Sequence, residues 1–240
     1  MSRESAAGKA RAAAGAPWQA RFCRAGIAFI GRRVFGFRFE IEGREMIPPG
    51  ESLIVAGGPH RNWIDGFLLL LALPPEPRVI FLASRAGLFN TRFKRAVLAV
   101  SAGFAPVENG GMLNRDALET GLAVLERGGR LGIFPEGGRH LEDLPERMGE
   151  AQRGVAFLAM ESGRRALPVA IAGGKPLWRG KTLRVRIGSP LDPPPPGSGK
   201  PEQQAWAAGL RDRLDDLIPP QPPIPADGRM PWPWLTTIFD

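Results

Sequence analysis

The sequence predicts a single α/β domain, with a mostly parallel or mixed sheet flanked by helices and an amphipathic helix at the N-terminus. Short apolar runs of strand length alternate along the chain with longer runs whose apolar residues recur at helical spacing. This alternation is typical of units in which a helix connects two parallel strands. With 240 residues, the chain is long enough to bury one complete core.

Residues 1–36 are predicted to form a basic, aromatic, membrane-associating segment. Among residues 1–39, eight Lys and Arg residues stand against the single Glu4, so +7 of the net charge of +8 lies there. Apolar side chains are interleaved with these cations, namely Trp18, Phe22, Ile27, Phe29, Ile30, Val34 and Phe35. This mixture is expected of a helix in an anionic lipid interface or, alternatively, of a docking helix with a solvated basic face. Residues 1–16, rich in Ala and Gly, are expected to be a mobile lead-in.

Residues 37–190 contain the alternating elements of the main domain. A half-buried strand is expected at 37–43, where apolar and polar residues alternate up to a Gly. Asn114 is expected to cap a helix that Gly128-Gly129 ends. The further strands are expected at 52–56, 79–83, 130–134, 166–172 and 183–187, and the helices at 63–73, 88–100, 114–127 and 150–162.

Residues 191–240 are predicted to be a Pro-rich linker, a docking helix and a tail. The linker is stiff because of its prolines, and Pro201 opens the helix. The helix should dock on the domain through apolar residues at helical spacing, which are Trp206, Leu210, Leu214 and Leu217. The tail from Pro219 has too many prolines for regular structure, and either packs on the domain or contacts lipid.

Composition argues against several classes of protein. Cys23 is the only cysteine, so no intramolecular disulfide can form, and a reduced, cytoplasmic setting is expected. No apolar run approaches the roughly 20 residues that span a bilayer, so a spanning or secreted protein is not expected. Outside the N-terminal segment the charge is nearly neutral, which argues against a nucleic-acid groove on the folded body.

His60 and Asp65 lie between the strand expected at 52–56 and the helix that follows it. Side chains at such a turn reach an open edge of the sheet. Asp65 can accept a hydrogen bond from one imidazole nitrogen and fix the tautomer, while the other nitrogen takes a proton from an incoming hydroxyl. The chain has two histidines, His60 and His140, so few residues can act as a base near neutral pH. A structural alternative is that His60 only caps the helix.

A second cluster, Phe134-Pro135-Glu136-Gly137-Gly138-Arg139, follows the strand expected at 130–134. Arg139 can hold a phosphate through two hydrogen bonds, and the glycines let the backbone approach a ligand. Glu136 can bind a hydroxyl or orient the Arg. The alternative is a tight turn with a surface ion pair.

Three motifs in order resemble those of the glycerolipid acyltransferase family, whose best-known members convert lysophosphatidic acid to phosphatidic acid. They are His60-x4-Asp65, Phe134-Pro135-Glu136-Gly137-x-Arg139 and Leu167-Pro168-Val169-Ala170-Ile171. The resemblance implies an α/β fold and O-acyltransferase activity with an acyl-CoA or acyl-carrier-protein donor and a lysolipid acceptor. It also implies no metal or other cofactor, and a peripheral location on the inner, cytoplasmic face of the membrane.

The same resemblance implies roles for individual residues. His60 would be the general base and Asp65 its orienting partner. Acceptor or cleft positions would be Arg85, Glu136, Gly137, Arg139 and Pro168.

The sequence departs from the family pattern at three positions. Pro59 replaces an Asn before the His, and Gly138 replaces a Ser or Thr before the Arg. Asn109 stands where an Arg is thought to hold the acceptor phosphate. The departure at Asn109 leaves open an acyltransferase for a lipid acceptor without phosphate.

Two other functions are alternatives to acyl transfer. A non-catalytic peripheral lipid-binding protein would keep the basic segment but not the reaction. A serine hydrolase using Ser101 in Ala99-Val100-Ser101-Ala102-Gly103 is disfavoured, because a nucleophile elbow needs a strand before the Ser and a helix is expected there.

Overall fold

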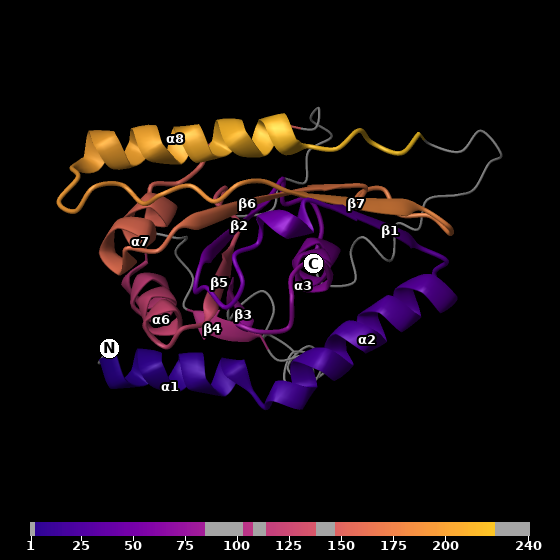
Figure 1. Cartoon of the computed structure of the whole chain (residues 1–240), viewed down its shortest axis with the longest axis horizontal. Helices are drawn as coiled ribbons and strands as arrows, with labels where there is room; N and C mark the ends of the chain where they lie inside the picture. Colours follow the sequence, from indigo (N-terminus) through magenta and orange to yellow (C-terminus); the bar gives the residue numbers. More distant parts are fainter. Residues whose placement is uncertain (1–2, 85–102, 108–113, 138–146, 224–240) are drawn as a thin grey trace.

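The structure is a computed structural model that describes residues 3–84, 103–107, 114–137 and 147–223. Seven strands of these residues form one sheet in the order β1-β7-β6-β2-β5-β3-β4 (Figure 1). The strands are β1 Arg38–Glu42, β2 Ile54–Gly58, β3 Val79–Ser84, β4 Phe104–Val107, β5 Arg130–Ile133, β6 Ala166–Ala172 and β7 Thr182–Ile187. The β6–β7 pair is antiparallel and the other five pairs are parallel. The prediction of a mixed α/β sheet is therefore confirmed.

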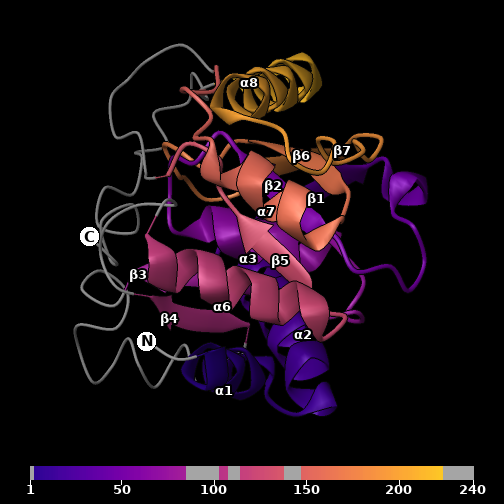
Figure 2. The same cartoon turned by 90° about the vertical axis from the view of Figure 1, so that its left-hand side faces the viewer.

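Helices cover both faces of the sheet. On one face lie α1 Arg3–Ala14, α6 Arg115–Glu126, α7 Gly154–Ser162 and α8 Lys200–Leu217. On the other face α3 Ile64–Ala72 packs directly on the strands, and α2 Pro17–Arg33 lies outside α3. Figure 2 shows α6 and α7 stacked in front of the sheet, with α8 above them and α1 below. A short 3-10 helix, η1 Arg44–Met46, follows β1.

The central strand β2 is buried on both faces, as a run of small and branched apolar residues predicts. Ile54 and Ala56 belong to the core under α6 and α7, whereas Val55 belongs to the core under α3. Each of the five residues of β2 is buried. The strand that leads to His60 is therefore held rigidly between two packed layers.

The edge strand β1 pairs with β7 and supplies carboxylates to its outward arginines. Side chains of β7 alternate between partly buried and buried, with Leu183, Val185 and Ile187 inward. The outward Arg184 bonds Glu40 on β1 at 2.7 Å, and Arg186 bonds Glu42 at 2.9 Å. Surface ion pairs of this kind contribute little stability, but they favour the observed pairing register of the two strands.

The expectation of a mobile lead-in at residues 1–16 is wrong, because residues 3–14 form α1. Ala6 and Ala10 are each 1% exposed, and Ala13 is buried with them. These small side chains give a flat face that lets α1 pack closely on α6. The Lys9 Nζ atom lies 2.6 Å from the Asp116 carboxylate on α6, which ties the two helices together. The sequence carries little signal for α1, because the buried face of this helix is made of Ala, which is only weakly hydrophobic.

The other expected elements occur with shifted ends. β2 begins and ends two residues later than predicted, and α7 begins at Gly154 rather than 150. β4 was not predicted, and the helix expected at 88–100 lies outside the described residues. Asn114 caps α6 as expected, accepting a hydrogen bond from the Asp116 N–H at 2.9 Å.

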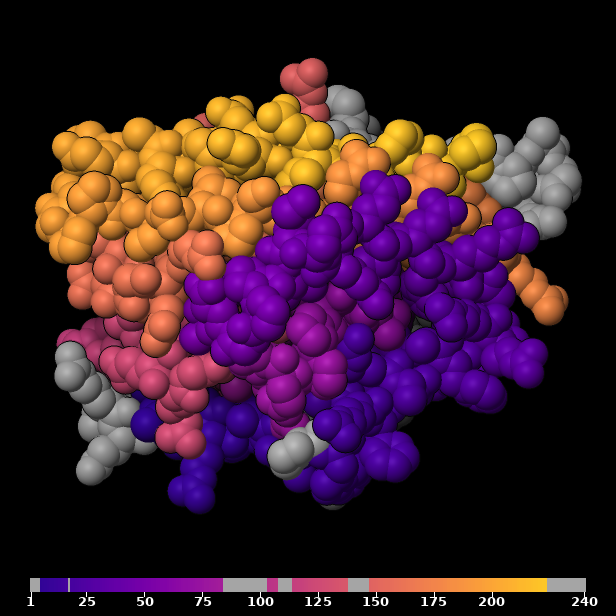
Figure 3. Space-filling model, viewed as in Figure 1, coloured from indigo at the N-terminus to yellow at the C-terminus, as the bar shows by residue number. Residues whose placement is uncertain are grey.

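The C-terminal helix α8 lies along the core that it was expected to cover. Ala207, Leu210 and Leu214 are each 0% exposed, whereas Trp206 is only partly buried. In the space-filling view α8 runs along one edge of the molecule, with α1 and α2 along the opposite edge (Figure 3).

Replacing Ala6 with Leu tests whether α1 is part of the core. We expect Ala6→Leu to lower the free energy of unfolding by about 1–3 kcal/mol, because the added methyl groups overpack a buried helix face. Ala12→Leu, at an exposed position of the same helix, is the control and should change stability little. Denaturant unfolding followed by circular dichroism measures both. Equal stability of the two variants would show that α1 is not packed as described.

Candidate active site

The site lies where three neighbouring parallel strands end. β2 pairs with β5 on one side and with β6 on the other, both in parallel. Parallel strands end at the same edge of a sheet, and clefts in α/β folds form at that edge. The segments after these strands, beginning at Pro59, Phe134 and Gly173, therefore converge there.

His60 and Asp65 form a hydrogen-bonded pair. The His60 Nδ1 atom lies 3.1 Å from Asp65 Oδ2. The Asp65 side chain is 1% exposed and that of His60 is 16% exposed, so the ring borders solvent while the carboxylate does not. The two side chains meet across five residues because His60 lies before α3 and Asp65 lies in the first turn of α3.

The backbone before α3 also holds the carboxylate. Asp65 Oδ2 accepts hydrogen bonds from the N–H groups of Arg61 and Asn62, each at 2.7 Å. With two donors already on Oδ2, this oxygen acts as an acceptor toward the ring, so Nδ1 carries the proton. The lone pair of Nε2 is then free to accept a proton. The first turn of a helix also favours a carboxylate, because the helix dipole is positive there.

Phe134 fixes the plane of the imidazole ring. Its ring stacks on that of His60 with centroids 3.8 Å apart and an angle of 10° between the planes. Phe81 stacks behind Phe134 with centroids 6.1 Å apart, which connects the site to the core under α3. The His60 ring therefore cannot tilt toward Phe134 without moving packed aromatic residues.

Glu136 anchors the backbone of His60. One carboxylate oxygen, Oε2, accepts a hydrogen bond from the His60 N–H at 2.8 Å, and Oε1 accepts one from the Gly149 N–H at 2.6 Å. The residue is 6% exposed. Glu136 thus joins the segment after β5 to the turn after β2, and it acts on His60 through the main chain.

Comparison with known proteins identifies the family of this chain. The chain matches a protein family described as Acyltransferase over residues 38–172, which is more than half of its length. The chain belongs to the acyltransferase family. The matched range contains His60, Asp65 and Glu136, and it ends with the last residue of β6.

Two individual proteins are similar to this acyltransferase. A 1-acyl-sn-glycerol-3-phosphate acyltransferase of Bacillus subtilis is 27% identical over 157 residues, covering 63% of this chain and 73% of that protein. The crystal structure of the 1-acyl-sn-glycerophosphate (LPA) acyltransferase PlsC from Thermotoga maritima has a TM-score of 0.61 at 21% identity. That match covers 82% of this chain and 80% of the other, and it supports the fold.

Of the residues predicted to bind substrate, Glu136 and Gly137 lie near His60 in the structure. Glu136 lies beside His60, but both of its oxygens bind backbone, so a role in acceptor binding stays a prediction. Gly137 has a φ of +78°, and a Cβ there would lie 2.2 Å from Gln152 Nε2, so the turn itself requires glycine. Arg85 and Arg139 lie outside the described residues, as do Asn109 and His140.

Pro168 does not reach the His60 side chain. It is buried in β6 opposite Ala56 of β2, two residue pairs before the end of that ladder. A Cβ on Gly188 would lie 3.1 Å from the Pro168 ring and 2.5 Å from Leu217 of α8. The ring of Pro168 therefore lies on the side of the sheet that α8 covers. This position does not support the expectation that the side chain of Pro168 binds substrate.

Sequence reasoning gave no role to Phe134, Asn62, Gly149 or Gly174. Phe134 stood inside a recognised motif, so its position directly after a strand was an available signal. The other three act through hydrogen bonds with the main chain or through the absence of a side chain, and residue type alone does not reveal such roles.

We expect Glu136→Ala to lower both stability and turnover. The substitution leaves the His60 and Gly149 N–H groups without acceptors, which costs about 1–3 kcal/mol for each group that stays buried and unsatisfied. Glu150→Ala, at an exposed carboxylate nearby in sequence, is the control. Denaturant unfolding and an acyl-transfer assay measure the two effects. Wild-type stability and turnover in Glu136→Ala would remove Glu136 from the site.

Proposed function

We propose that this acyltransferase moves a fatty acyl group from an acyl-CoA or acyl-carrier-protein thioester to the free hydroxyl of a lysophospholipid such as lysophosphatidic acid. The observation that carries the proposal is the His60–Asp65 pair, in which Nδ1 bonds Asp65, so Nε2 is the ring nitrogen that can accept a proton. The acceptor class is supported by the name of the Bacillus subtilis relative.

His60 acts as the general base in the proposed reaction. Nε2 takes the proton of the acceptor hydroxyl as its oxygen attacks the thioester carbonyl carbon. Asp65 stabilises the imidazolium that forms. The tetrahedral intermediate then expels the thiolate, which receives the proton from Nε2, so the products are an ester and a free thiol. No covalent bond to the protein is needed.

Two N–H groups shortly before α3 are excluded as donors for the oxyanion. The N–H groups of Arg61 and Asn62 both bind Asp65, so they are not available to the developing negative charge. Backbone N–H groups near a helix start can stabilise an oxyanion, but these two already have an acceptor, so the oxyanion needs other donors.

We also propose that α2 attaches the enzyme peripherally to the inner face of the membrane. The exposed aromatic residues of α2 support this, since Trp18 is 60% exposed, Phe22 71% and Phe29 63%. These three residues are four and seven positions apart, so they share one stripe of the helix. Exposed Arg21, Arg32 and Arg33 lie on the same helix and suit anionic lipid. None of the described helices is both long and apolar enough to cross a bilayer.

The opposite side of α2 is fixed to the catalytic domain. Arg24 donates hydrogen bonds to the carbonyl groups of Leu70 and Leu71 at the end of α3, and Arg44 also donates to Leu71 at 3.2 Å. Burial, together with the charge of Arg44, lowers the pKa of Arg24 from its ordinary value. Cations suit the C-terminal end of a helix, where the carbonyl groups lack partners. A bilayer bound to α2 would thus be held at a fixed distance from α3.

A second candidate function keeps the reaction and changes the acceptor. Asn109 stands where the family resemblance leads us to expect an arginine that holds the acceptor phosphate, and one guanidinium holds a doubly charged phosphate less well than two. An uncharged or zwitterionic lysolipid would fit such a site better. Incubating the purified enzyme with labelled acyl donors and a panel of lysolipids, then weighing the products by mass spectrometry, decides between the acceptors. Preferential acylation of lysophosphatidic acid supports the first candidate, and preferential acylation of an uncharged or zwitterionic lysolipid supports the second.

We predict that His60→Ala lowers turnover by at least about a hundredfold, because a positioned base contributes that much to proton transfer. His140→Ala, at the only other histidine, should retain most activity. The measurement is the rate of acyl transfer at saturating donor and acceptor, with folding checked by circular dichroism. Near-normal transfer by folded His60→Ala would refute the mechanism.

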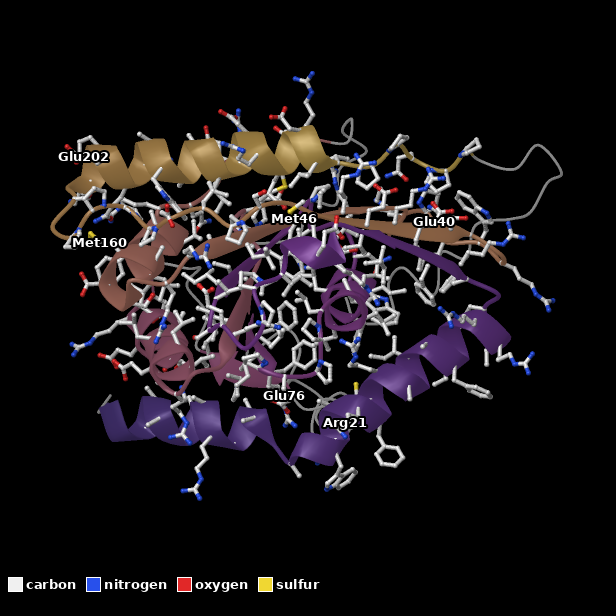
Figure 4. All side chains as sticks on the ribbon, viewed as in Figure 1. Arg21, Glu40, Met46, Glu76, Met160 and Glu202 are labelled. Carbon is white, nitrogen blue, oxygen red and sulfur yellow. The ribbon has the colours of Figure 1, made fainter. Side chains whose placement is uncertain are left out.

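The triple variant Trp18→Ser, Phe22→Ser and Phe29→Ser should bind anionic liposomes more weakly, because it removes the exposed aromatic stripe. Co-sedimentation with vesicles containing phosphatidylglycerol measures the binding. Met46→Ser is the control, since Met46 is 41% exposed but lies far from Arg21 of α2 in Figure 4. Unchanged binding of the triple variant would assign the attachment to another part of the chain.

A further inference from the structure

We infer that Asn62 and Gly174 are positioning residues for the His60–Asp65 pair, so that the turn after β6 sets the orientation of the catalytic carboxylate. The inference rests on the proposed role of His60 and deepens it. Neither residue has a group that reaches the reacting atoms. Both act through Asp65.

Asn62 links the turn after β6 to the segment before α3. Its side-chain Nδ2 donates to the Gly174 carbonyl at 2.9 Å, and its backbone N–H donates to Asp65 Oδ2 at 2.7 Å. The residue is 1% exposed. Its Oδ1 atom has no hydrogen-bond partner among the described residues, so the bond to Gly174 is the side-chain interaction that offsets the burial of this amide.

Gly174 lies directly against the other oxygen of Asp65. A Cβ atom at position 174 would lie 2.5 Å from Asp65 Oδ1, well inside van der Waals contact, and 3.8 Å from the Asn62 Cβ. Asp65 Oδ1 is buried without a hydrogen-bond partner among the described residues. Thus three donors hold Oδ2, while the backbone of Gly174 limits the position of Oδ1.

Glycine is required at position 174 because a side chain would clash with Asp65, and not because of the backbone conformation. The neighbouring Gly173 has a φ of +92°, but Gly174 is not among the glycines with positive φ. An alanine at position 174 would therefore not be forced into a left-handed backbone conformation. Its methyl group can be accommodated only if the carboxylate or the turn moves.

Movement of the carboxylate would reach His60 directly. The two oxygens of Asp65 belong to one rigid planar group, so displacement of Oδ1 rotates or shifts Oδ2 away from Nδ1. The imidazole then loses the partner that fixes its tautomer, and the fraction of rings with a free Nε2 lone pair falls. The same displacement weakens stabilisation of the imidazolium.

Gly174→Ala in the full-length enzyme tests the inference. Misplacing a catalytic group by about 1 Å costs up to roughly a hundredfold in rate, so we expect kcat to fall about ten- to hundredfold with little change in KM. Gly209→Ala on α8, where an added Cβ meets nothing within 4 Å, is the control and should keep wild-type kcat.

A spectroscopic signature separates positioning from general destabilisation. With two histidines in the chain, the Nδ1–H resonance of His60 in ¹⁵N-histidine-labelled protein can be assigned by its loss in His60→Gln. We expect this resonance in the wild type and in Gly209→Ala, and its loss or shift in Gly174→Ala. Asn62→Ala, which removes the link without adding a methyl group, should change it in the same way and serves if Gly174→Ala fails to fold.

The outcomes distinguish this inference from the proposed function. An unchanged Nδ1–H resonance and a kcat within about twofold of wild type in folded Gly174→Ala or Asn62→Ala would overturn the positioning role. A changed resonance in a protein whose wild type transfers no acyl group would support the positioning of Asp65 and refute the proposed function.

Discussion

The arrangement of the site depends on one buried oxygen, Oδ2 of Asp65. It accepts the N–H groups of Arg61 and Asn62, each at 2.7 Å, and it faces Nδ1 of His60 at 3.1 Å. Two of these donors fix the turn that carries His60, and the third is the ring of His60 itself. The same atom therefore folds the turn and orients the base. An acceptor with fewer lone pairs or without charge could not serve all three donors equally well.

Each of the three converging strands supports this pair. β2 carries the turn with His60, β5 leads to Phe134 and Glu136, and β6 leads to Gly174. Glu136 holds the His60 main chain, Phe134 holds the plane of its ring, and Gly174 borders Asp65. Because the strands are parallel and their centres are buried, these constraints come from the rigid part of the fold. The α3 helix adds the fourth support and is in turn bound at its far end by Arg24 and Arg44.

The sequence was sufficient to predict the sheet class, most strands and the His60–Asp65 pair. The short apolar run at 166–172 and the alternation at 183–187 both favour strands. His60 and Asp65 fall between a strand-like run and a helix-like run, which favours their meeting at the start of a helix. The sequence was not sufficient to predict α1, whose buried face is made of Ala, or the edge strand β4. The backbone roles of Glu136 and Asn62 were also hidden, because their partners, Gly149 and Gly174, lie 13 and 112 residues away and contribute main-chain atoms. Pro168 was assigned to substrate by its motif, whereas its strand position turns it toward α8.

The central claim is that Asp65 sets the proton position on His60, and the turnover of Asp65→Asn tests it most directly. Asparagine keeps the shape of the side chain but is neutral and presents an amide group that can face Nδ1, which would move the ring proton to Nε2. The account predicts that acyl transfer by folded Asp65→Asn falls at least about a hundredfold below wild type. Turnover close to that of the wild type would contradict it.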